Sequence, residues 1–157
     1  MSTDSHRHGG DALDAGAWTR HATERLGQAG FRSGGARTAV MERLAAQDCC
    51  LTAQEIFDAL RADGRKVGLA SVYRALEVLQ RLGLVQRLDL GGGTARYEAA
   101  RGVDHHHHIV CLDCGRVSPF EDRRLETAID RVARAQDFSV DEHDVVLRGR
   151  CPDCRAA

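Results

Sequence analysis

The residues in this sequence that are best able to do chemistry are two Cys-x-x-Cys pairs and a run of histidines. The pairs are Cys111/Cys114 and Cys151/Cys154. Four thiolates at this spacing are typical of a closed tetrahedral zinc site, in which each turn gives two sulfurs to one ion. The spacing therefore predicts a structural zinc, with two unrelated cysteine pairs or a redox dithiol as the alternatives. Such an ion contributes on the order of 10 kcal/mol to the folding of a small domain.

The histidine run covers His105, His106, His107 and His108 and leads directly toward Cys111. Imidazole is a good ligand for zinc, iron(II), nickel and copper. On a strand, side chains alternate between two faces, so His106 and His108 would point one way and His105 and His107 the other. One ion cannot take all four. We therefore expect two ions, or one ion with supporting histidines, and solvated loop histidines are the alternative.

Four more residues are candidate ligands, although each also has an ordinary interpretation. Glu98 could be a solvated strand residue, Glu126 a charge on a helix surface and His143 an exposed loop residue. Cys50 follows Cys49 directly, and a small buried apolar role is the default for at least one of this pair.

Composition indicates a globular protein with reduced thiols. The chain has 157 residues and a net charge of −1, and 43% of its residues are hydrophobic. No apolar run is long enough to span a membrane, and the N-terminus lacks a signal-peptide core. We therefore expect a cytoplasmic protein, and paired cysteines in that compartment more often bind metal than form disulfides.

The charge distribution singles out the middle of the chain. Residues 17–99 carry twelve basic and nine acidic side chains, whereas residues 1–16 and 100–157 each have a net charge of −2. A surface that faces nucleic-acid phosphates is therefore expected within residues 17–99.

The hydrophobic pattern predicts a winged helix-turn-helix over residues 17–99, after a disordered tail at 1–16. Apolar residues recur at helical spacing in four segments, at about 17–29, 36–46, 53–63 and 69–82. Residues 48–51 are expected to be a connector, after which Thr52 and Glu55 form a capping-box pattern at the start of the third helix. Segments 84–90 and 94–98 alternate like the two strands of a hairpin.

The helix at 68–82 is the one expected to meet DNA. With Val72 and Leu76 turned inward, Tyr73 and Arg74 face outward at its start, where they can contact a thymine methyl and guanine or phosphate. Arg37 and Arg32 are candidates for contacts with phosphate or the minor groove. The alternative is a surface helix that packs on another protein.

Residues 100–157 predict a small α/β unit. Strands are expected at 105–111, 115–120 and 144–150. An amphipathic helix is expected at 122–136, with Leu125, Ile129, Val132 and Ala133 on its inner face. This unit is too small for a large core, so a zinc ion and dimerisation would both supply missing stability. The fold class is therefore α+β, with an N-terminal winged helix-turn-helix and a C-terminal α/β dimerisation domain that holds structural zinc.

From Ala17 to Cys154 the chain resembles the ferric uptake regulator (Fur) superfamily of metal-dependent repressors. The resemblance rests on motifs at 68–74 (Gly-Leu-Ala-Ser-Val-Tyr-Arg), 95–98 (Ala-Arg-Tyr-Glu), 105–115 (the histidine run through Cys-Leu-Asp-Cys-Gly) and 151–154 (Cys-Pro-Asp-Cys). It implies a homodimer that binds a palindromic, A/T-rich double-stranded DNA operator. It also implies that Cys111, Cys114, Cys151 and Cys154 hold zinc.

The resemblance further implies two regulatory metal sites. The residues at the family's hinge-site positions are Cys50, Glu98, His106 and His108, and those at its dimerisation-domain positions are His105, His107, Glu126 and His143. The hinge residue before the third helix is commonly histidine, and a thiolate there favours zinc over iron(II). However, the zinc-sensing branch usually has its cysteine near the linker, where this chain has Ala99 and Ala100. Iron(II), zinc and manganese all stay open as the sensed ion.

Three other functions compete with metal-dependent repression. A metalloenzyme could use the histidines with Glu98 or Glu126 to activate water, but the chain has no His-Glu-x-x-His pattern. A metal store without DNA binding would not need the basic middle segment. A peroxide sensor of the same superfamily would oxidise its iron site, and Cys50 makes a thiol-based variant conceivable. We expect a regulator that is not an enzyme.

Overall fold

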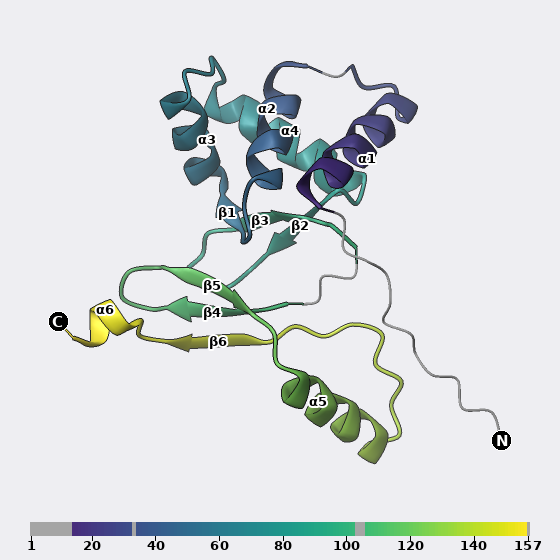
Figure 1. The fold of residues 1–157 in the computed structure, drawn as a ribbon, viewed down its shortest axis with the longest axis vertical. Coiled ribbons are helices and arrows are strands. Elements are labelled where there is room, and N and C mark those ends of the chain that lie inside the picture. Colours follow the sequence, from purple (N-terminus) through teal and green to yellow (C-terminus); the bar gives the residue numbers. More distant parts are fainter. Residues whose placement is uncertain (1–13, 33, 103–105, 157) are drawn as a thin grey trace. The chain divides into compact units, whose positions relative to one another are not determined.

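The computed structural model describes residues 14–32, 34–102 and 106–156 (Figure 1). The chain divides into two compact units, Met1–Asp104 and His105–Ala157. The sequence predicts the domain boundary at residues 99–100, slightly before this division. Each unit is described by itself.

The N-terminal unit contains four helices and a small sheet among its described residues. The helices are α1 (Ala15–Gln28), α2 (Gly35–Ala45), α3 (Ala53–Ala62) and α4 (Leu69–Arg81). The strands are β1 (Leu51–Thr52), β2 (Val85–Leu88) and β3 (Arg96–Ala99), in the order β1-β3-β2. β2 and β3 form the predicted hairpin, and the comparisons reported below confirm the predicted α+β class.

Helix α1 begins earlier than the sequence suggests. The Asp14 side chain accepts a hydrogen bond of 2.7 Å from the backbone N–H of Ala17 and so caps the helix. Ala15 and Gly16, which the sequence places in a disordered tail, are therefore helical. The rest of the predicted tail, 1–13, lies outside the described residues.

Strand β1 is a structural element that the sequence does not reveal. The segment before α3 was expected to be a connector, but Leu51 pairs with Tyr97 and Thr52 with Arg96 in antiparallel register. Two residues are too few to show the alternation by which strands are predicted.

The apolar faces of all four helices meet in one core. Trp18, Val40, Ile56, Val72 and Leu79 are fully buried there. The same faces are the ones that the sequence periodicity selects, because residues three and four apart lie on one side of a helix.

The predicted capping box of α3 is present. Thr52 Oγ1 accepts from the backbone N–H of Glu55 at 3.1 Å, and Glu55 Oε2 accepts from the backbone N–H of Thr52 at 2.7 Å. Arg96 on β3 also donates to Glu55 Oε2, at 3.2 Å. One carboxylate therefore joins the start of α3 to the sheet.

The C-terminal unit is built around a second sheet. Its strands are β4 (His107–Cys111), β5 (Val117–Phe120) and β6 (Val146–Gly149), in the order β5-β4-β6. The central strand β4 pairs with β5 in antiparallel orientation and with β6 in parallel orientation. Helix α5 (Arg123–Ala135) makes the crossover to β6, and the short helix α6 (Pro152–Arg155), which the sequence did not predict, follows it.

The apolar face of α5 is the clearest departure from the sequence interpretation. Leu125, Ile129, Val132 and Ala133 were expected to be inside, but none of the described residues of α5 is buried, and Val132 is 60% exposed. Leu125, Ile129 and Ala133 are half-buried, so the C-terminal unit on its own covers this face only in part. Among the described residues, no helix is long and apolar enough to span a membrane.

We predict that Thr52→Ala will destabilise the N-terminal unit by about 1 kcal/mol, because it removes the side-chain oxygen that caps α3. The measurement is denaturant unfolding followed by the fluorescence of Trp18, the one tryptophan of the chain and a buried residue of this unit. Thr23→Ala is the matched control, since Thr23 is exposed and its hydroxyl donates only within α1. An equal loss of stability in both variants would contradict the capping role.

Candidate metal centres and recognition helix

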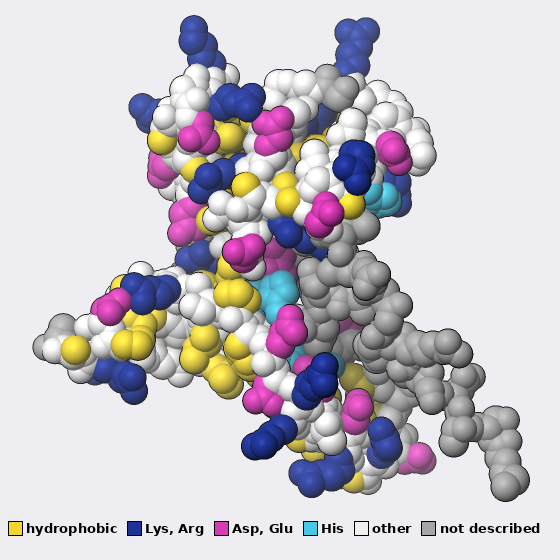
Figure 2. Space-filling view, in the orientation of Figure 1, with side chains coloured by type: hydrophobic (Ala, Val, Ile, Leu, Met, Phe, Trp, Pro, Cys, Tyr) yellow, Lys and Arg dark blue, Asp and Glu magenta, His cyan; other side chains and the backbone are white. Residues whose placement is uncertain are grey.

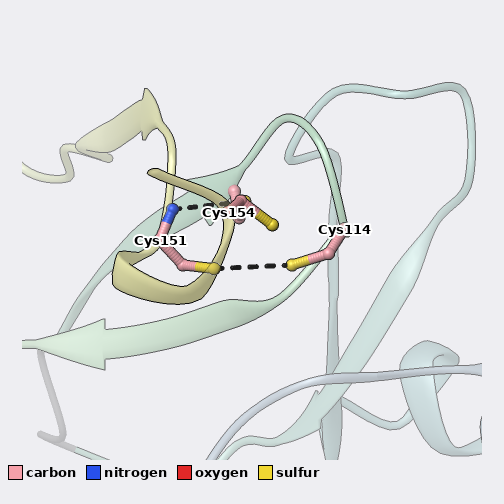
Figure 3. Close-up of side chains that lie close together, drawn as sticks. Cys114, Cys151 and Cys154 are labelled. Atoms are coloured by element: carbon pink, nitrogen blue, oxygen red, sulfur yellow. Dashed lines mark hydrogen bonds between the residues drawn. The ribbon is translucent and has the colours of Figure 1, made fainter. Parts of the chain in front are cut away.

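Four cysteines converge at one end of the C-terminal sheet. Cys111 ends β4, Cys114 lies in the turn after it, and Cys151 and Cys154 lie around the start of α6. Their four sulfur atoms all lie within 4.8 Å of one another. Figure 3 shows the sulfurs of Cys114 and Cys151 pointing toward each other, at 3.7 Å. This set of donors fits a tetrahedral zinc ion, whose Zn–S bonds are about 2.3 Å long.

Backbone geometry brings these cysteines together. Parallel pairing of Cys111 with Gly149 carries the second Cys-x-x-Cys turn to the first. Gly115 has φ +73° and donates to the Cys111 carbonyl, so the first turn closes in a conformation that other residues rarely adopt. These backbone features bring the two turns, and with them the four sulfurs, to one place.

Hydrogen bonds already prepare one sulfur as a thiolate. The backbone N–H of Cys151 donates to Cys111 Sγ at 3.3 Å, and this bond is the largest cause that lowers the pKa of Cys111 to about 6. Hydrogen bonds with the thiols of Cys151 and Cys114 raise the pKa of Cys154 to about 12. A cation bound among the four sulfurs would favour their thiolate forms.

Two ion pairs cross between the cysteine turns. Asp113, in the first turn, accepts from Arg150 at 3.0 Å, and Asp153, in the second, accepts from Arg116 at 2.7 Å. The sequence analysis did not identify these four residues as part of the site. The signal that could have found them is that each Cys-x-x-Cys motif ends in Asp-Cys and has an arginine close to it. All four side chains are largely exposed, so the pairs add little stability and mainly orient the turns.

A second cluster lies between β4, α5 and the segment before β6. Glu126 accepts from Nε2 of His107 at 2.6 Å and from Nε2 of His143 at 3.1 Å. His107 is buried, and its ring centroid lies 5.4 Å from that of His143. Two imidazoles and a carboxylate within 4.8 Å of one another suit a borderline divalent ion. The structure thus brings together three of the four predicted ligands, and His105 lies outside the described residues.

The predicted hinge ligands are divided between the two units. Cys50 precedes β1, and the β1–β3 register places it opposite Glu98 on β3. In the C-terminal unit, the rings of His106 and His108 are 5.0 Å apart, edge to face. Each unit therefore contains one pair of these residues, and their use as one four-ligand site stays a prediction.

Helix α4 presents the predicted DNA-contacting side chains. Tyr73 is 51% exposed, and Arg74 is exposed and donates to Ser71 Oγ at 3.0 Å. Both lie in the first half of the helix, while Val72, Ala75 and Leu76 are buried. The fold of this unit thus leaves the start of α4 available for a groove.

Arg32 and Arg37 differ in their surroundings. Arg32 is exposed, whereas the Arg37 guanidinium stacks over the Phe31 ring at 5.0 Å and donates to the Arg32 carbonyl at 3.3 Å. Arg37 thus stabilises the turn between α1 and α2. Figure 2 shows Lys and Arg side chains, in dark blue, projecting from the end of this unit that lies away from its sheet.

Comparison with known proteins identifies the class to which this fold and these clusters belong. The model of the ferric uptake regulator family matches residues 28–148. The ferric uptake regulation protein of Neisseria meningitidis (serogroup A) is 35% identical over 106 residues, which cover 68% of this chain and 73% of the relative. The chain therefore belongs to the ferric uptake regulator family.

Solved structures agree with this assignment. The Vibrio cholerae ferric uptake regulator matches with a TM-score of 0.74 and 32% identity over 82% of this chain and 98% of that one. The Pseudomonas aeruginosa regulator, solved with manganese, matches with a TM-score of 0.66 and 31% identity over 83% and 98%. The chain is thus a metal-responsive transcription factor of this family, and its four-cysteine site could hold a structural zinc.

We predict that Cys114→Ser will abolish one equivalent of tightly bound zinc and unfold the C-terminal unit. Metal analysis should show the loss of zinc, and amide hydrogen exchange should accelerate across β4, β5 and β6. Trp18 fluorescence should stay native, because Trp18 lies in the other unit. Asp113→Asn is the control, since Asp113 occupies the same turn but offers no thiolate. A zinc-free variant with a protected C-terminal sheet would show that the four cysteines are not a structural site.

Proposed function

We propose that this protein is a cytoplasmic repressor of genes for metal-ion homeostasis, whose DNA affinity rises when a regulatory metal binds. The observation that carries the proposal is that one chain combines the outward-facing Tyr73 and Arg74 of α4 with the His107–Glu126–His143 cluster. The first can read DNA and the second can bind a divalent ion. Membership of the family supports the link between them.

The proposed switch is a metal site with ligands from both units. Cys50 and Glu98 would come from the N-terminal unit, and His106 and His108 from the C-terminal unit. An ion bound by both would favour one arrangement of the units over others, and that arrangement would be the one that fits DNA. The coupling expected for such linkage is about 1–3 kcal/mol. The His107–Glu126–His143 cluster, with His105, would be a further site.

The proposed partner is a palindromic, A/T-rich operator that is bound by a homodimer. Figure 2 shows hydrophobic side chains, in yellow, gathered on the visible face of the C-terminal unit. Large exposed apolar residues of this unit are Ile109, Leu112, Val132, Phe138, Val140 and Leu147. Ile109 and Leu147 are directly paired across β4 and β6. Such an apolar surface is what a second copy would cover, and two copies would present two α4 helices to two half-sites.

We predict that removing the regulatory metal will weaken operator binding by about 5–150-fold, which corresponds to the usual coupling energy. The measurement is fluorescence anisotropy with a labelled promoter fragment, with iron(II), zinc and manganese each buffered. Arg74→Ala should weaken binding by a similar factor while metal binding is kept, because one good base or phosphate contact is lost.

Arg81→Ala is the matched control for Arg74→Ala. It removes an exposed arginine of the same helix, at its far end, where it pairs only with Glu77 across one turn. DNA affinity that is the same with each metal and with chelator would refute the proposed switch. Equal effects of the two arginine variants would refute the assignment of the contact to the start of α4.

We predict that Leu147→Asp will convert a dimer into monomers, because it places a charge in the exposed apolar face of β6. The measurement is molar mass by light scattering during size-exclusion chromatography. Arg148→Glu is the control, since this exposed neighbour on the same strand points to the opposite face. A dimer that survives Leu147→Asp but not Arg148→Glu would place the interface on the other face of the sheet.

A further inference from the structure

Two adjacent thiols stand in the connector between α2 and β1. The sulfurs of Cys49 and Cys50 lie 3.8 Å apart, Cys50 is buried, and Cys49 is half-buried. Neighbouring side chains of an extended strand point to opposite faces. Here the backbone bends at Asp48 and Cys49, so the two sulfurs can approach each other.

The separation of these sulfurs has a chemical meaning. The two sulfurs are not bonded to each other, because a disulfide would require about 2.05 Å. Two thiolates on one tetrahedral zinc, each about 2.3 Å from the ion, lie about 3.8 Å from each other. Cys114 and Cys151, in the four-cysteine site, are 3.7 Å apart. Cys49 and Cys50 therefore have the spacing of two ligands of one ion.

The connector is held in place on both sides of the thiols. The Arg101 guanidinium donates to the carbonyls of Ala45 and Gln47, at 2.5 and 3.0 Å, just before the pair. Directly after it, Leu51 enters the sheet opposite Tyr97. A preorganised pair of donors loses little conformational freedom on binding, which favours chelation.

Charged groups around the pair come from β3. The pairing of Leu51 with Tyr97 and of Thr52 with Arg96 brings β3, which carries Arg96 and Glu98, next to the connector. The hydrogen bond with Cys49, burial and the nearby Glu98 charge raise the pKa of Cys50, while Arg96 opposes them.

We propose that Cys49 and Cys50 bind one ion together as two thiolates and make the site selective for a thiophilic divalent ion, zinc, over iron(II) and manganese(II). Two sulfur donors favour the softer ion, and zinc also exceeds both rivals in the general order of affinity. This inference rests on the proposed function and deepens it: it adds Cys49 to the site assigned to Cys50 and Glu98, and it names the metal.

The test uses the reduced full-length protein with zinc already in its four-cysteine site, and cobalt(II) as the probe. Thiolate ligands give cobalt(II) an intense charge-transfer absorption. We expect this band in the wild-type protein, about half of it in Cys49→Ser, and its loss to added zinc but not to manganese. Zinc affinity, measured by competition with a chelating dye, should fall by more than about tenfold in Cys49→Ser.

Asp48→Asn is the matched control, because it alters the exposed neighbouring residue and removes no sulfur. It should keep the band and the zinc affinity. Cys50 is buried, so Cys50→Ser is read only in samples whose Trp18 fluorescence is native, and the half-buried Cys49 decides the test. A Cys49→Ser protein with an unchanged band and unchanged zinc affinity would overturn the inference.

DNA binding by the same samples separates this inference from the proposed function. If metal controls DNA affinity but Cys49→Ser leaves the preference for zinc intact, the proposed Cys49–Cys50 ligand pair is wrong and the proposed metal-dependent repressor stands. If the thiolate band is present but no metal alters DNA affinity, the ligand pair stands and the proposed repressor mechanism is wrong. Cobalt(II) that enters the four-cysteine site instead would displace the zinc bound there, and the displaced zinc can be measured in solution. If the absorption band appears only when zinc is displaced, the inference is also overturned.

Discussion

The scarcity of apolar core in the C-terminal unit is the constraint on which the rest of this structure depends. Among the described residues of that unit, the buried ones are His107, His108 and Cys111, and each carries a metal-binding atom. Hydrophobic burial therefore cannot hold the sheet to its crossover helix. Cations and a second protein chain supply the stability that a larger domain would take from its interior. The stability of the C-terminal unit thus depends on metal, apart from any role of metal in regulation.

The N-terminal unit obeys the opposite rule. Its core runs through all four helices, and its polar links, such as the carboxylate of Glu55 between Thr52 and Arg96, reinforce elements that are already packed. The start of α4 is thus fixed by packing within its own unit. In the proposed switch, the metal therefore changes the position of the recognition helices and not their internal conformation.

Much of the N-terminal unit could be predicted, because local signals and the tertiary fold agree there. The periodicity of the helices and the Thr52–Glu55 pattern are confirmed by the buried faces and by the cap. Strand β1 escaped prediction because two residues have no periodicity. The early start of α1 escaped because Asp14 lies in a polar stretch that looks like the tail before it.

The C-terminal unit was harder to predict, because some of its apolar residues are not buried within the single chain. Helix α5 has an apolar face, and the rule that apolar faces are buried fails for one chain alone. Side-chain alternation correctly placed His107 apart from His108, since His107 meets Glu126 and His143. The Cys49–Cys50 approach depends on a backbone bend that no residue type at those positions signals.

The parallel pairing of β4 with β6 also affects the order in which the two units fold. The last element of the N-terminal unit is β3, which ends at Ala99, whereas the four-cysteine site must join Cys111 to Cys151 across a crossover helix. On a ribosome, the DNA-binding unit can therefore fold while the cysteine turns are still apart. A growing chain acquires its recognition helix first, and it gains the means to pair with a second copy only after residue 151 has emerged and found both its strand and its ion.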